Sequence, residues 1–495
     1  MKNILIIVIL AISASIAGCT KDSNTGSDPN TTSDSPSVTG FSPVTGTAGT
    51  TVTITGKNFS STISADIVKF NGSAATISSA TSVQIIVTVP SGATTGKITV
   101  TVGTKCATSA DDFTVSTTSS STYSQSSGTV TQSEKTYSSS TADLSAVKVA
   151  GGTYSISSST ISSTGNTSSS DNSSFYGLNA VVLAYGGNAV INSTGNIIAS
   201  TGKGANGIFA YGTASITSTG DKFSQAGDGG HAIMCSGGGT ITVKNDTAIT
   251  SGASSSTIAT DRGGGTITVT GGTYKAEGSR SAAIYSTGTI TCTNAALTAT
   301  GAEALVIEGS NYIALNNCTT KCTNNKWGSL IYQSMSGDAS GADGHLTITG
   351  GSFTYTGTSG GMFYNTNSTA HISLNNVTLV NGCDTLVRCI KGSWGASSAS
   401  SGGITYLTTS GQAMSGLIYV DASSSFTMAL SNSSVLTGKV NPANVAGSAK
   451  VTMDATSTWT LTGNSYLTSL TDAASDYSNI TAGSFSLYVN GIKIK

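Results

Sequence analysis

The chain has 495 residues, enough for two or three domains. Its 22 Lys and Arg residues balance 23 Asp and Glu residues, so it lacks the basic face that a nucleic-acid-binding protein needs. Only 9% of the residues are charged and 60 are glycine, which suits an extracellular β-solenoid better than a cytoplasmic enzyme. Regularly spaced aliphatic residues argue against a disordered chain.

The N-terminus has the pattern of a targeting segment, because an apolar run from Ile4 to Ile12 follows Met1, Lys2 and Asn3. The segment ends in the residues IAGC, at positions 16–19. This ending resembles the signal peptide and lipobox of bacterial lipoproteins. The resemblance implies that residues 1–18 are removed and that Cys19 is lipidated; an ordinary secretory signal is the alternative.

Residue 20 is Thr rather than Asp, which by analogy with Gram-negative lipoproteins favours the outer membrane. No other stretch of the sequence is long and apolar enough to span a membrane. We therefore expect a protein of the bacterial cell envelope, at the outer membrane or cell surface, held by its lipid alone. Residues 19–36 are polar and predict a flexible tether.

Residues 37–116 contain short alternating runs that predict an antiparallel β-sandwich: TVTIT, IVKF, VQIIVTV and KITVTV. The segments FSPVTGTAGTTVTITGKNF, VKFNGSAATI and VPSGATTGKITVTV resemble the immunoglobulin-like IPT/TIG domain. That resemblance implies a spacer. Residues 117–127, rich in Ser and Thr, predict a second linker.

From about residue 177 to residue 440 the sequence repeats roughly every 25 residues, as in NAVVLAYGGNAVINSTG followed by NGIFAYGTASITSTG. Such a period is typical of a solenoid. Each full repeat holds three short runs, which predict three strands per turn. We therefore expect residues 128–495 to form a parallel β-helix of about a dozen turns with a C-terminal cap, right-handed like most parallel connections.

The middle run predicts two inward columns separated by an outward column of threonine. A corner of Gly or Asn follows it, since these residues tolerate positive φ, and the third run ends on glycine. The first inward column is Ile216, Ile241, Ile267, Ile290, Ile313, Leu346, Ile372, Ile404 and Phe426, and the second includes Val243, Val269, Cys292, Leu315, Ile348, Leu374, Tyr406 and Met428. The corner column is Gly220, Asn245, Gly271, Asn294, Asn317, Gly350 and Asn376.

Segments such as ATDRGGGTITVTGG and STWTLTGNSYLTSL resemble secreted bacterial β-helix proteins described as adhesin-like or autotransporter-passenger-like. The resemblance covers most of residues 128–490, but it specifies no activity. Insertions at residues 165–176 and 334–344 are expected to be loops that leave one corner.

The first run of each repeat predicts an inward column that contains Val306, Ile331 and, anomalously, Arg388. The next column would then face outward as an aromatic and aliphatic stripe, which suits the stacking of sugars beside polar side chains. That stripe is Leu183, Phe209, Met234, Ala259, Tyr285, Ile307, Tyr332, Tyr364, Cys389 and Tyr419, and the binding candidates are Tyr285, Tyr332, Gln333, Tyr364, Asn365 and Tyr419. The alternative is that loops cover the stripe or that it belongs to the core.

Carboxylates are rare, and those near one expected corner are candidates for acid/base chemistry on a glycan. These catalytic candidates are Asp261, Arg262, Glu303, Glu308 and Asp338. A polysaccharide lyase would use Arg262 or Arg280 as its base, whereas the structural alternative is an Asp–Arg pair with loop-capping carboxylates.

We expect no cofactor and no metal site, because Cys318 and Cys322 are two thiols alone and the three histidines lie in other repeats. The leading hypothesis is a lipid-anchored, adhesin-like surface protein that binds glycan or another surface and is not an enzyme. The alternatives are a β-helix carbohydrate-active enzyme and a purely structural surface protein.

Overall fold

A computed structural model describes residues 35–46, 49–90, 93–115, 122–393 and 402–495. Contacts divide the chain into two units, Met1–Ser119 and Ser120–Lys495. The expected signal peptide, Cys19 and most of the tether lie outside the described residues. Within the described ranges, no helix is both long enough and apolar enough to cross a membrane.

The first unit is a β-sandwich, as predicted. Its two sheets have the strand orders β1-β3-β7-β6 and β2-β9-β8-β4-β5. Alternating aliphatic residues face inward and make its core, in which Phe70 and Phe113 meet edge to face at 5.0 Å. The elements are β1 (Ser37–Ser42), β2 (Thr45–Gly46), β3 (Thr51–Lys57), the 3₁₀ helix η1 (Ile63–Ala65), β4 (Asp66–Phe70), β5 (Ser73–Ala74), β6 (Thr76–Thr81), β7 (Gln84–Thr88), β8 (Gly96–Val102) and β9 (Lys105–Val115).

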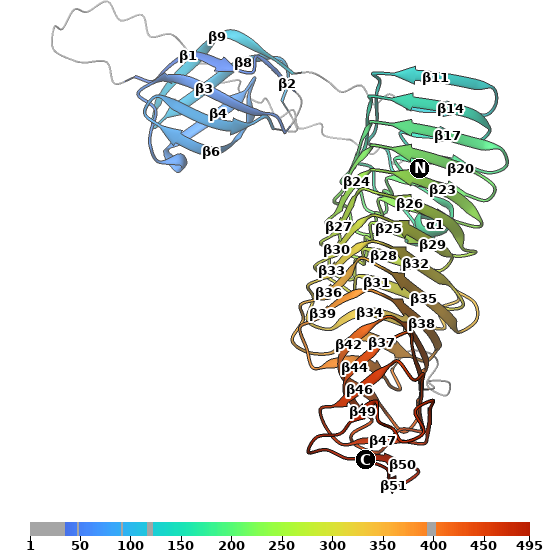
Figure 1. The fold of residues 1–495 in the computed structure, drawn as a ribbon. Coiled ribbons are helices and arrows are strands. Elements are labelled where there is room, and N and C mark those ends of the chain that lie inside the picture. The colour runs from blue at the N-terminus through green and yellow to red at the C-terminus, as the bar shows by residue number, and fades with distance from the viewer. Residues whose placement is uncertain (1–34, 47–48, 91–92, 116–121, 394–401) are drawn as a thin grey trace, which may run out of the picture. The chain divides into compact units, whose positions relative to one another are not determined.

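The second unit is a parallel β-solenoid, in which successive turns stack as rungs (Figure 1). In the described residues its three sheets hold 15, 14 and 10 strands, so it makes about 14 turns. Sheet 1 consists of β10 (Tyr123–Gln125), β13 (Val147–Val149), β16 (Val182–Tyr185), β19 (Ile208–Tyr211), β22 (Ile233–Ser236), β25 (Ile258–Thr260), β28 (Ile284–Ser286), β31 (Leu305–Glu308), β34 (Trp327–Tyr332), β37 (Gly361–Thr366), β40 (Thr385–Cys389), β42 (Ala413–Val420), β44 (Val435–Val440), β46 (Thr458–Leu461) and β49 (Ile480–Thr481).

Sheets 2 and 3 complete each turn. Sheet 2 consists of β11 (Thr129–Ser133), β14 (Gly152–Ser157), β17 (Ala189–Thr194), β20 (Ser215–Thr219), β23 (Gly239–Lys244), β26 (Gly265–Thr270), β29 (Thr289–Thr293), β32 (Tyr312–Asn316), β35 (Asp343–Thr349), β38 (Thr369–Asn375), β41 (Ile404–Ser410), β43 (Ser425–Ser431), β45 (Ser448–Met453) and β48 (Ser469–Asp472). Sheet 3 consists of β12 (Thr136–Ser139), β15 (Thr160–Ser163), β18 (Ile197–Ser200), β21 (Lys222–Gln225), β24 (Thr247–Thr250), β27 (Thr273–Ala276), β30 (Ala296–Ala299), β33 (Thr319–Cys322), β36 (Ser352–Tyr355) and β39 (Thr378–Asn381).

Sheet 3 ends at β39, so the three-strand turn applies only to the first ten turns of the described solenoid. After it, long strands such as β42 and β44 of sheet 1 alternate with strands of sheet 2. A small sheet of β47 (Ser465–Leu467), β50 (Leu487–Val489) and β51 (Ile492–Lys493) follows near the C-terminus. At the other end, β10 begins at Tyr123, inside the predicted 117–127 linker, and the Tyr123 ring stacks on Tyr154 at 4.4 Å.

The inward columns predicted for sheet 2 form the core, except in β41. There β38 pairs Ile372 with Leu407, so Thr405, Leu407 and Thr409 face inward. Ile404 and Tyr406, which were expected inside, are exposed. The slip arises because β41 carries Thr405 at an inward position and the bulky Ile404 and Tyr406 at outward positions, unlike its neighbours.

Glycine serves two different purposes at the corners. Every member of the predicted Gly or Asn corner column has a positive φ, for example 54° at Asn245 and 68° at Gly271. The glycines that end the third run instead permit close approach between turns. A Cβ on Gly278 would stand 1.8 Å from the carbonyl oxygen of Gly252, and one on Gly227 would stand 1.9 Å from that of Gly202.

Candidate functional site

Two insertions leave the solenoid from different corners, not from one as the sequence suggested. The first, before β16, forms helix α1 (Ser170–Tyr176) between sheets 3 and 1. Ser169 caps this helix by accepting a hydrogen bond from the backbone N–H of Asn172, and Gly177 ends it with φ 71°. The second insertion, residues 333–342, lies between β34 and β35 at the corner of sheets 1 and 2. Both contact residues of sheet 1.

The stripe on the outer face of sheet 1 differs from the predicted one after Tyr285. Strand pairing places Val306, Leu330 and Arg388 in it. Ile307 and Cys389 face the core. Arg388, which the sequence placed among inward residues, therefore lies on the outer face of the solenoid with its guanidinium outside the core. The observed stripe is Leu183, Phe209, Met234, Ala259, Tyr285, Val306, Leu330, Tyr364, Arg388 and Tyr419.

Much of this stripe is buried although it lies outside the solenoid. Leu183, Phe209, Met234 and Ala259 form a small core of their own. Gly177, at the end of α1, lies so close that a Cβ there would stand 2.6 Å from Leu183. The outer face of sheet 1 is therefore apolar beneath α1, and the helix owes its position to that surface.

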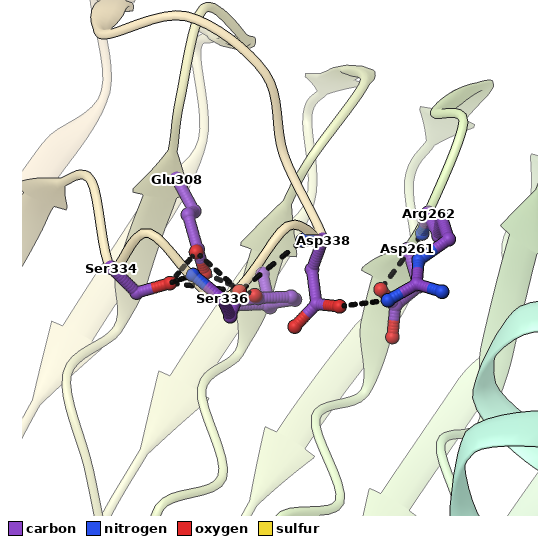
Figure 2. Close-up of polar contacts among 7 residues, drawn as sticks. Asp261, Arg262, Glu308, Ser334, Ser336 and Asp338 are labelled. Atoms are coloured by element: carbon purple, nitrogen blue, oxygen red, sulfur yellow. Dashed lines mark hydrogen bonds and ion pairs between the residues drawn. The ribbon is translucent and has the colours of Figure 1, made fainter. Parts of the chain in front are cut away.

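Glu308 is the centre of a hydrogen-bonded cluster at the end of β31. Its carboxylate accepts hydrogen bonds from the hydroxyls of Tyr285 (2.6 Å), Tyr332 (2.8 Å) and Ser336 (3.3 Å), and from that of Ser334. Figure 2 shows the two serines of the second insertion reaching this side chain. Because Glu308 is buried, these donors replace the water that its charge has lost.

Asp261, Arg262 and Asp338 form a second polar group beside the Glu308 cluster (Figure 2). Arg262 donates to Asp338 at 3.1 Å, and its guanidinium lies 3.9 Å from the ring centroid of Phe175 in α1. Arg262 therefore touches both insertions. Burial, together with the charges of Asp338 and Glu308, raises the pKa of Asp261 to about 7, while the backbone N–H of Arg262 opposes the rise.

The structure brings four of the five catalytic candidates together and separates the fifth. Glu303 precedes β31, at the opposite end of the strand from Glu308, and burial raises its pKa. The nearby Lys326 opposes that rise. It belongs to the corner of sheets 3 and 1 and takes no part in the described contacts of the Glu308 cluster.

The remaining binding candidates contact other protein groups. Gln333 and Asn365 are buried and donate to backbone carbonyls, Gln333 to Ala339 and Gly341, Asn365 to Ser368 and Ile404.

Tyr364 is buried and stacks on Trp327 at 4.0 Å. Tyr419 lies beneath Arg388, whose guanidinium carbon is 5.2 Å from the ring centroid. Of the stripe's tyrosines, Tyr285 alone also lines a pocket described below.

Helix α1 separates two pockets on the outer face of sheet 1. Pocket A, of about 400 Å³, lies on the side of Asn172 and Tyr176. Pocket B, of about 520 Å³, lies on the side of Ser170 and Ser174. Pocket A is lined by Thr122, Tyr123, Ser124, Asp143, Leu144, Ser145, Lys148, Asn172, Tyr176, Leu178, Asn179, Leu183 and Tyr185. Its three tyrosines and several polar side chains were not singled out from the sequence.

Pocket B is more strongly charged. It is lined by Lys203, Asp228 and Arg280, with Tyr285 at one side. His231 also lines it, and burial lowers the pKa of this imidazole to about 4, so the ring is neutral at physiological pH. The pocket combines two cations with one carboxylate.

Comparison with known proteins identifies the first unit. Residues 36–123 match the IPT/TIG domain family, which confirms the IPT/TIG domain predicted from the sequence. No curated protein matches the chain.

Solved structures with local similarity include an auxiliary nutrient binding protein from Bacteroides thetaiotaomicron VPI-5482, which is 25% identical over 18% of this chain and 22% of that chain, with a TM-score of 0.17. Another is an auxiliary nutrient binding protein from Bacteroides ovatus ATCC 8483, which is 24% identical over 17% of this chain and 20% of that chain, with a TM-score of 0.16. The chain thus spans about a fifth of the length of these proteins. At such TM-scores no argument about fold or function rests on them.

Proposed function

We propose that the chain is a lipid-anchored protein of the bacterial cell surface that binds glycan in pocket A. The observation that carries this proposal is the ring of Tyr185, which lines the pocket. One face of the ring stacks on Tyr211 at 4.9 Å. The preceding strand, β13, ends at Val149 opposite Ala184 and pairs no residue with Tyr185, but its exposed Lys148 holds an ammonium over the ring, 5.4 Å from the centroid.

The surroundings of Tyr185 suit a sugar. Aromatic rings bind the C–H faces of sugars, and nearby polar groups bind the hydroxyls. The carboxylate of Asp143 and the amide of Asn172 line the same pocket. Hydrogen bonds from Ser168 and Thr167 lower the pKa of Asp143, which keeps it an ionised acceptor. The exposed Lys148 ammonium lies 5.4 Å from the Tyr185 ring centroid and supplies a donor.

The geometry of the Glu308 cluster argues against glycan hydrolysis by these carboxylates. An acid/base pair must reach the substrate with at least one lone pair or proton of each carboxyl group. Glu308 instead accepts hydrogen bonds from four hydroxyl groups, and Asp338 forms an ion pair with Arg262. These contacts hold residues 333–342 against sheet 1, and Arg262 also lies over Phe175 of α1, which is a structural task.

The proposed anchoring depends on Cys19, with the IPT/TIG domain as a spacer between lipid and solenoid. The experiment is to fractionate bacteria that express the chain and its Cys19→Ser variant. We expect the unchanged chain in the membrane fraction and the variant in the soluble fraction. Equal partitioning of the unchanged chain and the variant would refute the lipid anchor, and it would have no bearing on the glycan proposal.

Glycan binding is tested with an array probed by the purified chain, followed by titration of any glycan retained. Replacing Tyr185 with alanine should weaken binding by about tenfold or more, because the stacking surface is lost. Tyr466→Ala is the matched control, since Tyr466 stacks on Tyr488 at 4.8 Å in the C-terminal sheet. An array without any retained glycan would favour a structural role, and equal loss in both variants would refute pocket A as the site.

A further inference from the structure

Two of the three histidines lie side by side on the outer face of sheet 2. Strand β35 pairs with β38 so that His345 stands directly beside His371. Asp343 precedes His345 by two residues and therefore projects from the same face of the strand. Its carboxylate lies 2.8 Å from Nε2 of His371 and 3.6 Å from Nε2 of His345.

Two tyrosines frame this histidine pair. Tyr312 stacks on His345 at 4.6 Å, and Tyr406 stacks on His371 at 5.0 Å. The two imidazoles are 4.6 Å apart and 10° from parallel. The four rings thus form one ladder along the solenoid, with each inner face covered by a neighbour. Such a ladder offers its edges rather than its faces to solvent, so it does not suit sugar stacking.

We propose that Asp343, His345 and His371 bind one divalent transition-metal ion such as Zn²⁺ or Cu²⁺. Two imidazole nitrogens and one carboxylate oxygen are the donor set that these ions prefer, whereas Ca²⁺ and Mg²⁺ prefer oxygen ligands alone. Three protein ligands leave a fourth tetrahedral position that faces solvent. The ion would be held by residues of two neighbouring turns, which only the stacking of the solenoid brings together.

The distances require a modest rearrangement of the site around the ion, because the 2.8 Å between Asp343 and His371 must lengthen while the longest separation must shorten. The three ligand atoms all lie within 4.8 Å of one another. Ligand bonds of about 2.1 Å in a tetrahedral site set these separations near 3.4 Å. Rotation of the imidazoles about their side-chain torsions supplies this movement. The side chains have room for it, being 31% exposed in His345 and 39% exposed in His371.

The test is a titration of the full chain, carrying no polyhistidine tag, with Zn²⁺ alone. We expect one equivalent to bind with a Kd of about 10 µM or tighter. Electron paramagnetic resonance of the Cu²⁺-loaded chain should show coupling to two nitrogens. His345→Gln and His371→Gln should each weaken Zn²⁺ binding by about tenfold or more, and Asp343→Asn by a similar factor.

The matched control is Asp384→Asn, which removes an exposed carboxylate from another part of the solenoid and should leave Zn²⁺ binding unchanged. All the substituted side chains project from the outer face of the solenoid, so the melting curves of the variants should resemble that of the unchanged chain in the absence of metal. Absence of stoichiometric Zn²⁺ binding would overturn the proposal. Binding that persists in the double variant His345→Gln/His371→Gln would also overturn it, because the ion would then occupy another site such as the free thiols.

Discussion

Replacing Asp246 with asparagine should stabilise the solenoid at neutral pH but not at acid pH. Asp246 is fully buried at the corner of sheets 2 and 3. Its carboxylate accepts hydrogen bonds from the backbone N–H of Asp221 at 2.9 Å and from the hydroxyl of Ser218. Asn196 occupies the same corner two turns earlier and accepts from the backbone N–H of Ser159 at 2.9 Å. Asparagine therefore fits this position.

The size of the effect follows from the pKa of Asp246. Burial raises it from 3.8 to about 7, and the charge of Asp221 adds to the rise. The folded chain therefore binds more protons than the unfolded chain between these two pH values, and its stability falls as pH increases through that window. Each tenfold change in proton affinity corresponds to 1.36 kcal/mol, so ionisation destabilises the fold by about 4 kcal/mol above pH 7. Asp246→Asn removes this penalty.

The assay is urea unfolding of both chains at pH 4.5 and pH 8, followed by tryptophan fluorescence; all three tryptophans of the sequence follow residue 120, and Trp459 is buried in the solenoid. At pH 8 the variant should be more stable than the unchanged chain by about 2–4 kcal/mol, where the lower value allows for a weaker hydrogen bond from the Ser218 hydroxyl. At pH 4.5 the two chains should have similar free energies of unfolding.

Asp454→Asn is the control. Hydrogen bonds, first that of the Ser457 side chain, lower the pKa of Asp454 to about 2, so it is ionised in both states throughout this range. Its effect should be the same at both pH values. A difference between Asp246→Asn and the unchanged chain that does not vary with pH would refute the reasoning.

Three further substitutions test the backbone packing and the second insertion. Gly278→Ala should lower the stability by at least about 3 kcal/mol or prevent folding, because the new Cβ would meet the Gly252 carbonyl oxygen; a melting temperature within 2 °C of the unchanged chain, as ~1 kcal/mol would give, would contradict this. Glu308→Gln should weaken four hydrogen bonds, two of which attach Ser334 and Ser336 of residues 333–342 to sheet 1, and should speed proteolysis of that segment. Asp338→Asn breaks a half-exposed ion pair and should have a smaller effect on the same cleavage, within about 1 kcal/mol of stability.

The sequence predicted sheet 2 well because its two faces differ. Threonine outside and aliphatic residues inside alternate with period two, so the inward and outward positions of a strand can be assigned from its own sequence alone. The corner column was predicted equally well, since Asn245 and Gly271 both adopt the positive φ that their residue types indicate. In β41 the bulky Ile404 and Tyr406 lie outside and Thr405 lies inside, and there the prediction was wrong.

The inward and outward positions of sheet 1 could not be assigned from the sequence in the same way. Its strands carry apolar residues on both faces, since the inner face packs in the core and the outer face packs in part beneath α1. Runs such as Leu305-Val306-Ile307 then have no alternation to read. Pairing across turns decides the register instead, and it moves Val306 outward and Ile307 inward.

The histidine pair escaped the sequence prediction for a related reason. The sequence analysis considers the histidines only as partners for Cys318 and Cys322, from which they are separated by lying in other repeats. His345 and His371 are 26 residues apart in neighbouring repeats, and in a solenoid one period along the chain is one strand spacing in space. Both histidines directly precede the same inward column, at Leu346 and Ile372, and this shared place in the repeat was the available signal.

The two insertions indicate where this solenoid departs from a plain scaffold. A repeat that only has to stack needs neither α1 nor residues 333–342, and the two segments leave from opposite edges of sheet 1. Arg262 nevertheless connects them, because its guanidinium lies over Phe175 of α1 and pairs with Asp338 of the second insertion. Pockets A and B exist because α1 stands on that face. A binding site built on a repetitive rod must break the repeat somewhere, and in this chain the outer face of sheet 1 is where both insertions break it.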